Sequence, residues 1–117
     1  MNRLDLQTEF EKILGSRNVY FQPPASVKMQ YPAIVYSLKN IEKNFANNLS
    51  YIVTDGYEVI LIDKNPDSIY IKKILELPYC GFDRYYTSDN LNHFVFTIYN
   101  KGGQKYDYKK YVYFTIR

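Results

Sequence analysis

The chain has 117 residues and a mass of 13.9 kDa, which is the size of one domain, and dividing it would leave neither half with a proper hydrophobic core. Hydrophobic residues make up 46% of it and aromatic residues 18%, so the composition argues against a disordered chain. The formal net charge of +3 is small, and the interspersed acids and bases do not by themselves argue for a polyanionic partner.

The cysteine count and the hydropathy of the sequence indicate the cellular compartment of the chain. Cys80 is the one cysteine, so an intramolecular disulfide is impossible and a cysteine-based zinc site lacks its ligands. No apolar run approaches the roughly 20 residues needed to cross a bilayer, and the N-terminus does not read as a signal peptide. The sequence therefore predicts a cytoplasmic chain without a membrane partner.

An amphipathic helix is predicted at the N-terminus. Its apolar residues recur at helical spacing: Leu6, Phe10, Ile13 and Leu14. Asn2 is suited to cap the start, Asp5 follows it by three residues in the first turn, and Gly15 supplies the stop.

The next part of the chain is predicted to be mainly extended. Residues 18–22, closed by two prolines, suggest an edge segment or arm, and residues 33–38 a central strand. Residues 40–50 are polar and rich in Asn, which predicts a loop that projects from the body. Residues 51–63 are β-prone, and the Asp55-Gly56 pair permits a hairpin or a bulge, of which one long bulged strand is favoured.

A second helix is predicted from Asn65, which precedes a proline and an acid in the order typical of a helix start. Its buried stripe is predicted to be Ile71, Ile74 and Leu75. Pro78 ends this helix at or before Leu77.

A β-hairpin and a final strand complete the predicted elements. Residues 80–87 and 93–99 alternate as strands, joined by a turn at 88–92, and residues 106–116 are again β-prone. The expected order is α-β-β-β-α-β-β-β. The economical architecture is a single α+β domain with a mainly antiparallel β-sheet and both helices packed on one face.

Candidate catalytic residues are few. His93 is the lone imidazole, and it could act as a base for Cys80, but a cysteine that behaves as a small hydrophobe is the commoner case. Four aspartates could be considered for a mechanism that uses two carboxylates, but each suits a local role in a turn or a helix cap. They are Asp63, Asp67, Asp83 and Asp89. The sequence therefore predicts no catalytic residue, cofactor or metal, and no enzyme.

Residues 105–113 interleave lysines with tyrosines, the composition that stacks bases and follows a phosphate backbone. The interpretation favoured here is an edge strand whose lysines discourage aggregation, or a strand between subunits. A nucleic-acid-binding module that uses this strand stays as an alternative.

Several short stretches carry a resemblance to a known family. They are Asn18-Val19-Tyr20-Phe21-Gln22-Pro23-Pro24, Tyr31-Pro32-Ala33-Ile34-Val35-Tyr36, Ile62-Asp63-Lys64-Asn65-Pro66-Asp67-Ser68, Leu77-Pro78-Tyr79-Cys80, Phe82-Asp83-Arg84 and Asp89-Asn90-Leu91-Asn92-His93. Through them the chain resembles small neck and tail proteins of tailed bacteriophages and prophages, most closely the tail terminator or tail completion family. The similarity covers residues 4–99, so residues 100–117 form a C-terminal extension beyond it.

The resemblance implies a structural role in the virion. Members of that family share this α+β layout and form a hexameric ring at the head-proximal end of the tail tube, where they stop tube polymerisation and present a surface for the head connector. The implied partners are copies of the chain itself, the tail tube protein, the head–tail connector or stopper protein, and DNA passing through the bore. Such a chain would reside in the host cytoplasm during assembly. Catalytic residues and cofactors are not implied.

On this hypothesis, the 40–50 segment and the arm at 18–24 contact neighbouring subunits. The candidate interface residues are Tyr20, Phe21, Phe45, Tyr51, Tyr108, Tyr111 and Tyr113. The candidate DNA-facing residues are Lys105, Lys109 and Lys110. The alternatives are another neck component, such as a head-completion or stopper protein, the nucleic-acid-binding module above, and a small enzyme built on Cys80 and His93.

Overall fold

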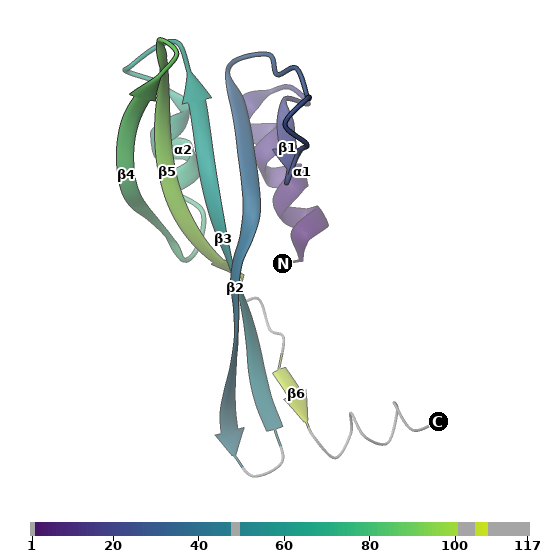
Figure 1. Cartoon of the computed structure of the whole chain (residues 1–117). Coiled ribbons are helices and arrows are strands. Elements are labelled where there is room, and N and C mark those ends of the chain that lie inside the picture. The colour runs from purple at the N-terminus through teal and green to yellow at the C-terminus, as the bar shows by residue number, and fades with distance from the viewer. Residues whose placement is uncertain (1, 48–49, 101–104, 108–117) are drawn as a thin grey trace.

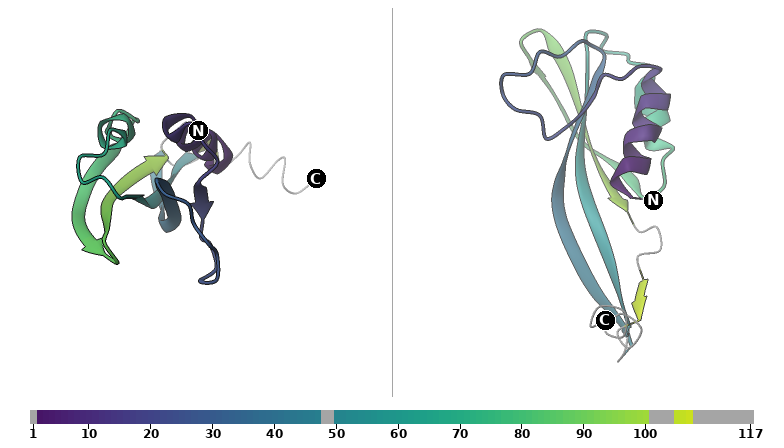
Figure 2. Two further views of the ribbon diagram at one scale, coloured as in Figure 1. Left: turned by 90° about the horizontal axis from the view of Figure 1, so that it is seen from above. Right: turned by 90° about the vertical axis from the view of Figure 1, so that its right-hand side faces the viewer.

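The computed structural model describes residues 2–47, 50–100 and 105–107. Their elements, in chain order, are α1 (Arg3–Leu14), β1 (Val19–Phe21), β2 (Ala33–Asn47), β3 (Ser50–Asp63), α2 (Tyr70–Leu75), β4 (Cys80–Ser88), β5 (Leu91–Asn100) and β6 (Lys105–Asp107). The sheet has the strand order β1-β2-β3-β5-β4, with β6 added to β3, and both helices lie on one face of it (Figures 1 and 2). The predicted α+β class and the predicted element order are confirmed.

The start of α1 is fixed by a reciprocal capping box. The Oδ1 atom of Asn2 accepts a hydrogen bond from the Asp5 backbone N–H at 2.9 Å, and Asp5 Oδ2 accepts one from the Asn2 N–H at 3.0 Å. Gly15 ends the helix in the left-handed region at φ 68°, where a residue without Cβ is favoured. Both ends of this helix therefore follow from the local sequence, as predicted.

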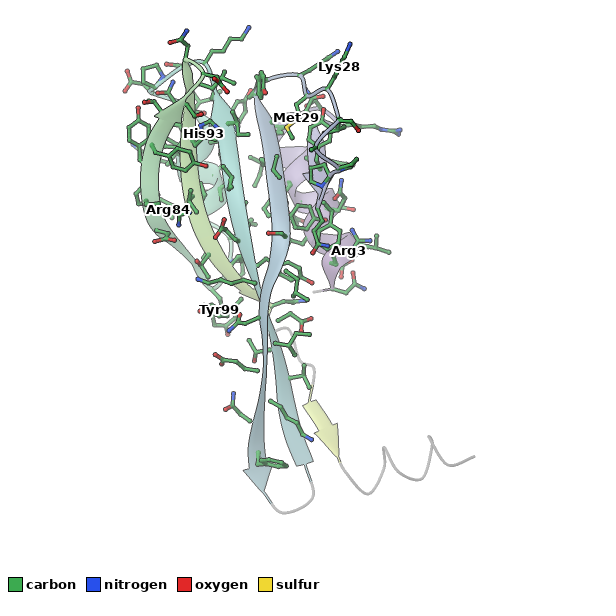
Figure 3. The ribbon with its side chains drawn as sticks, in the orientation of Figure 1. Arg3, Lys28, Met29, Arg84, His93 and Tyr99 are labelled. Atoms are coloured by element: carbon green, nitrogen blue, oxygen red, sulfur yellow. The ribbon has the colours of Figure 1, made fainter. Side chains whose placement is uncertain are left out.

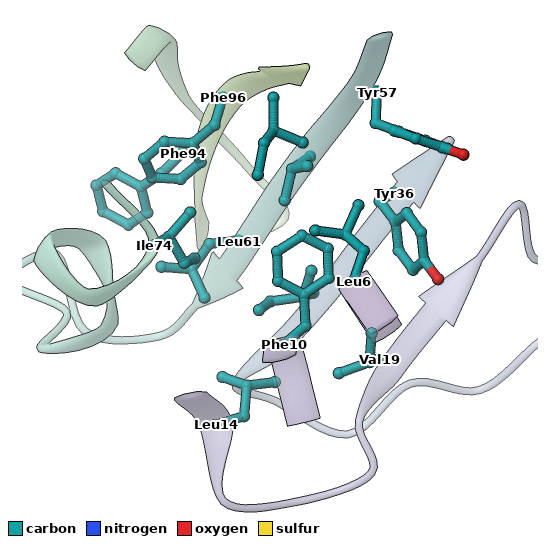
Figure 4. Packing of buried hydrophobic residues seen from close by; sticks show 13 residues of the cluster. Leu6, Phe10, Leu14, Val19, Tyr36, Tyr57, Leu61, Ile74, Phe94 and Phe96 are labelled. Carbon is teal, nitrogen blue, oxygen red and sulfur yellow. The ribbon is translucent and has the colours of Figure 1, made fainter. Parts of the chain in front are cut away.

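The hydrophobic core lies between the helices and the sheet (Figure 4). Its buried members are Leu6, Phe10, Leu14, Val19, Ile34, Tyr36, Tyr57, Val59, Leu61, Ile74, Phe94, Phe96 and Ile98. Phe10 of α1 meets the Tyr36 ring edge-on at a centroid distance of 5.2 Å. The Tyr36 hydroxyl donates to Gln7 Oε1 at 2.6 Å, and burial raises the pKa of Tyr36. The core thus joins the helices to β2, β3 and β5.

The predicted loop at 40–50 is wrong. Residues Asn40 to Asn47 continue β2 and pair with β3 as an antiparallel hairpin, with register irregularities near Leu38 and Phe45. We call residues 41–47 of β2 and 50–54 of β3 the ribbon, because β5 leaves β3 at Asp55. The ribbon projects from the body, as was expected of the loop (Figure 1). Strand β3 confirms the interpretation of residues 51–63 as one long strand. The predicted bulge at Asp55-Gly56 is wrong, because the extra residue at this level is Lys39 of β2.

The second helix is shorter than predicted. It begins at Tyr70, because the polar residues before it form tight turns in which Asp63 Oδ1 accepts the Asn65 N–H at 3.0 Å and Asn65 Oδ1 accepts the Asp67 N–H at 2.9 Å. Of the predicted buried stripe, Ile74 is fully buried but Leu75 is exposed.

The predicted hairpin at 80–99 is confirmed with a shorter turn. Asp89 and Asn90 alone connect β4 to β5, at φ 54° and 63°, and two consecutive positive φ angles are the signature of a type I′ turn. Asn92 fixes the neighbouring loop, since its Nδ2 donates to the carbonyls of Asp63 and Lys64 at 3.1 and 3.2 Å. Of the predicted strand at 106–116, β6 covers the beginning, and residues 108–116 lie outside the described residues.

Candidate subunit interfaces

The ribbon presents an apolar face to solvent. Ile41, Lys43 and Phe45 alternate along β2 and therefore share one side of it. Ile41 is 62% exposed and Phe45 is 75% exposed. The Lys43 ammonium lies 5.2 Å from the centroid of the Phe45 ring, a cation–π distance. Two large apolar side chains on a projecting hairpin are typical of a surface that a partner covers.

The base of the ribbon is tightly packed around Gly56. This glycine is paired with Asn40 of β2 on one side and with Tyr99 of β5 on the other. A Cβ atom there would collide with the Asn40 Oδ1 atom and lie 3.1 Å from the Tyr99 ring. The absence of a side chain at Gly56 thus lets Asn40 and Tyr99 pack across β3 where the ribbon leaves the body.

Strand β4, at one edge of the sheet, forms a second exposed apolar surface. Phe82 and Tyr85 are 49% and 48% exposed, although each contacts an aromatic residue of β5: Phe82 lies 5.6 Å from Phe96 and Tyr85 lies 5.1 Å from Phe94 between ring centroids. We call Phe82 and Tyr85, with the strand that carries them, the aromatic edge. The sequence predicted this strand but not its role as a candidate interface.

A bulge at Asp83 separates these two aromatic residues in the sequence and keeps them on one face. The register with β5 shifts between Phe82 and Arg84, so one extra residue is accommodated in β4. Arg84 Nη1 donates to Asp83 Oδ2 at 2.8 Å, which pairs the two charges at the centre of the strand. Figure 3 shows Arg84 on this outer strand. The signal in the sequence was the dense aromatic content of residues 82–86.

Two predicted interface residues, Tyr20 and Phe21, lie on β1. The Phe21 ring is 4.9 Å from the Tyr36 ring, and the Arg3 guanidinium lies 4.5 Å over it. Tyr20 accepts the Gln30 backbone N–H at its hydroxyl at 3.5 Å. Both side chains are half-buried, so β1 offers less exposed apolar surface than the ribbon or the aromatic edge.

The other predicted residues fall near the ribbon or beyond the described residues. Tyr51 is paired with Phe45 across the ribbon, so the register brings these two predicted residues together. Lys105 is paired with Ile52 through β6. The candidates outside the described residues are Tyr108, Lys109, Lys110, Tyr111 and Tyr113.

Cys80 and His93 do not form a catalytic pair. Cys80 is in register with Ile98, five residues along β5 from His93, which separates them by about 17 Å. Burial raises the pKa of the Cys80 thiol to about 11, and His93 stacks on Tyr86 with centroids 4.6 Å apart. In the part of the chain that the structure describes, no group of three or more His, Cys, Asp or Glu residues is placed to hold a metal ion.

A shallow groove of about 440 Å³ lies between the two helices. Its lining consists of Glu9, Lys12, Ile13, Lys73, Glu76 and Leu77. Two acids and two bases surround two aliphatic side chains, and Lys12 already pairs with Glu9 at 3.6 Å. The groove has neither a dominant charge nor a deep apolar floor, so it ranks below the two exposed surfaces of the sheet as a candidate site.

No protein-family model matches the chain, and none of the curated proteins matches it. Within the described residues, neither helix has the length and apolar character needed to span a membrane.

Proposed function

We propose that the chain is a structural subunit that closes into a ring at the head-proximal end of a bacteriophage tail tube, ends tube polymerisation and joins the tail to the head connector. The observation that carries the assembly part of this proposal is the presence of two unlike exposed apolar surfaces on one sheet, the ribbon and the aromatic edge. A subunit that contacts its neighbour through two different surfaces makes a heterologous contact, and such contacts close into rings when the rotation fits.

The two surfaces are suited to this role because they lie at different ends of the molecule. The aromatic edge is on the last strand of the sheet order, whereas the ribbon is the part of β2 and β3 that extends past the end of β5 (Figure 1). A neighbour can therefore contact one surface without blocking the other. In a closed ring each subunit uses both surfaces. Ring closure therefore buries Ile41 and Phe45 of the ribbon and also Phe82 and Tyr85 of the aromatic edge.

The tail-specific part of the proposal rests on the resemblance of residues 4–99 to tail terminator proteins. It supplies the ring of six copies, the tail tube protein and the head–tail connector as partners, and a location in the virion. DNA passing through the bore would meet lysines by nonspecific, salt-sensitive attraction, for which Lys105, Lys109 and Lys110 are the candidates.

The experiment that tests this function combines the purified chain with a polymerising tail tube protein from the same genome. Electron microscopy of the mixture should show tubes that end in a ring at one end, and the tubes should stop growing once the ring is present. Rings that bind the connector but leave tube growth unchanged would favour another neck component. Tight binding of single-stranded DNA by the chain, without rings, would favour the nucleic-acid-binding alternative.

A further inference from the structure

The aromatic edge has backbone groups directed outward, away from β5. The Tyr99 N–H donates to the Tyr79 carbonyl at 3.1 Å, which makes the Tyr79–Tyr99 pair a hydrogen-bonded one. Hydrogen-bonded and non-hydrogen-bonded pairs alternate in an antiparallel ladder, and the bulge at Asp83 shifts this alternation by one residue on β4. The N–H groups of Phe82 and Tyr85 therefore point away from β5.

This edge is incompletely covered in the described chain. β4 is the terminal strand of the sheet order, and among the described residues it pairs with β5 alone. Phe82 and Tyr85 face the side of the sheet that carries the helices, since their partners Phe96 and Phe94 belong to the core. About half of each side chain remains exposed. A long edge strand with exposed aromatic residues is a template for an added strand.

The direction of β6 determines which segment of the chain could pair with the outer edge of β4. Lys105 pairs with Ile52 and Asp107 pairs with Ser50, so the chain runs along β6 toward the tip of the ribbon and away from the body (Figure 1). Asp107, after which residues 108–117 follow in the sequence, therefore lies beside Ser50 near the tip of the ribbon.

Residues 108–117 are too few to pair along the whole length of β4 of their own chain. Their starting point beside Ser50 lies seven residues along β3 from Tyr57, the level at which β4 begins through Ile98 and Cys80. That return covers about 23 Å, and pairing along the nine residues of β4 needs about 30 Å more. Ten extended residues span at most about 36 Å, which is less than the sum.

We propose that residues 108–117 of one copy add as a strand to the aromatic edge of a neighbouring copy, a contact that rests on the proposed self-assembly. These ten residues are enough to cover the nine residues of β4. Residues 111–116, Tyr-Val-Tyr-Phe-Thr-Ile, are all β-branched or aromatic and favour a strand. Aromatic residues occur at both the odd and the even positions of the segment. Whichever face of the added strand lies toward the helices, it therefore places an aromatic ring beside Phe82 and Tyr85.

Cross-linking of full-length chains tests this contact directly. In a Cys80→Ser background, one chain carries Thr87→Cys on β4, and a second chain of different mass carries a single cysteine at one of the positions 109–115, so that both faces of the segment are sampled. A short bis-maleimide linker should join the two chains at one or more of these positions. As a matched control, the second chain carries Phe45→Cys in place of the C-terminal cysteine. A cross-link from this variant would show that the ribbon of the neighbour, and not its residues 108–117, lies beside β4. Linkage from position 45 in place of 109–115, or no linkage at any position, would overturn the proposal.

Blocking the backbone of the aromatic edge gives an independent readout. Tyr85→Pro removes an outward N–H that the ladder with β5 does not use, whereas Tyr85→Ala removes the same side chain and keeps that N–H. We expect the cross-link yield to fall at least tenfold further in the proline variant than in the alanine variant, with circular dichroism showing that both are folded. Equal yields in the two folded variants would count against strand addition.

The outcomes separate this contact from the proposed function. Rings that form and cap tubes without a cross-link from residues 109–115 overturn the strand addition and leave the tail role in place. Cross-linked oligomers that ignore tail tubes support the strand addition and contradict the tail role. A chain that remains monomeric and unlinked beside the tube protein overturns both.

Discussion

Phe45→Ala should weaken assembly while leaving the fold intact. Phe45 exposes 75% of its surface in the single chain, so little of its burial energy is realised before a neighbour covers it. Complete burial of a Phe side chain contributes about 1.5–3 kcal/mol. Burying the remaining three quarters therefore contributes about 1–2 kcal/mol per contact, which corresponds to about a 5- to 30-fold change in the subunit dissociation constant.

The free energy of unfolding of the single chain should change by less than about 0.5 kcal/mol, as expected for an exposed position. Ile69→Ala is the matched control, because Ile69 is 66% exposed but lies at the start of α2, away from the ribbon. Sedimentation equilibrium gives the assembly constants, and urea unfolding at a concentration where the chain is monomeric gives the stabilities. Unchanged assembly in Phe45→Ala, or the same loss in Ile69→Ala, would refute the role of the ribbon as an interface.

Three further predictions concern the single chain. Phe10→Ala should lower the free energy of unfolding by about 3–5 kcal/mol, measured by urea titration, because Phe10 is fully buried at the centre of the core; a loss below about 1 kcal/mol would contradict this packing. Gly56→Ala should lower it by about 1–3 kcal/mol through the collision with Asn40, whereas Gly81→Ala, which meets nothing within 4 Å, should change it by less than about 0.5 kcal/mol; equal effects would refute the tight ribbon base. Since the folded-state pKa of Cys80 is raised from 9.0 to about 11, its contribution to stability is complete below pH 9 and is lost as the pH rises toward 11. Cys80→Ser should therefore flatten the decline of stability over that range, and an unchanged slope would show that the thiol does not contribute.

Local signals in the sequence predicted the elements whose ends depend on short-range chemistry. The helix α1 was predicted with both termini, since Asn2 and Gly15 act within one turn of the backbone they cap. The hairpin of β4 and β5 was predicted because its residues alternate and its connection is rich in turn-forming side chains. The helix α2 was predicted too early, because Asn65 satisfies backbone groups of a turn as readily as those of a helix start.

The ribbon could not be predicted from hydrophobic alternation. A strand acquires an alternating pattern when one of its faces is buried, and the ribbon projects beyond the core, so its polar Asn-rich sequence resembled a loop. Its strand structure instead follows from the pairing with β3, a contact between segments whose register no local signal specifies. Phe45 was nevertheless predicted as an interface residue, and the structure places it on the exposed face of the ribbon.

The aromatic edge was missed for a related reason. The sequence of residues 82–86 predicts a strand, but the position of that strand at the end of the sheet is a property of the whole topology. In the middle of the sheet, Phe82 and Tyr85 would be ordinary core residues. At the edge, half of each ring is exposed, and the same side chains become a candidate interface.

The mass of the assembled full-length chain tests the central claim most directly. Native mass spectrometry over a range of concentrations, alone and with the tail tube protein, should give a closed oligomer of one fixed stoichiometry, expected to be six, that persists on dilution better in wild type than in Phe45→Ala. A chain that stays monomeric at high concentration beside the tube protein, or that forms aggregates without a fixed number of copies, would contradict the proposal that its two exposed surfaces exist to bind neighbouring subunits.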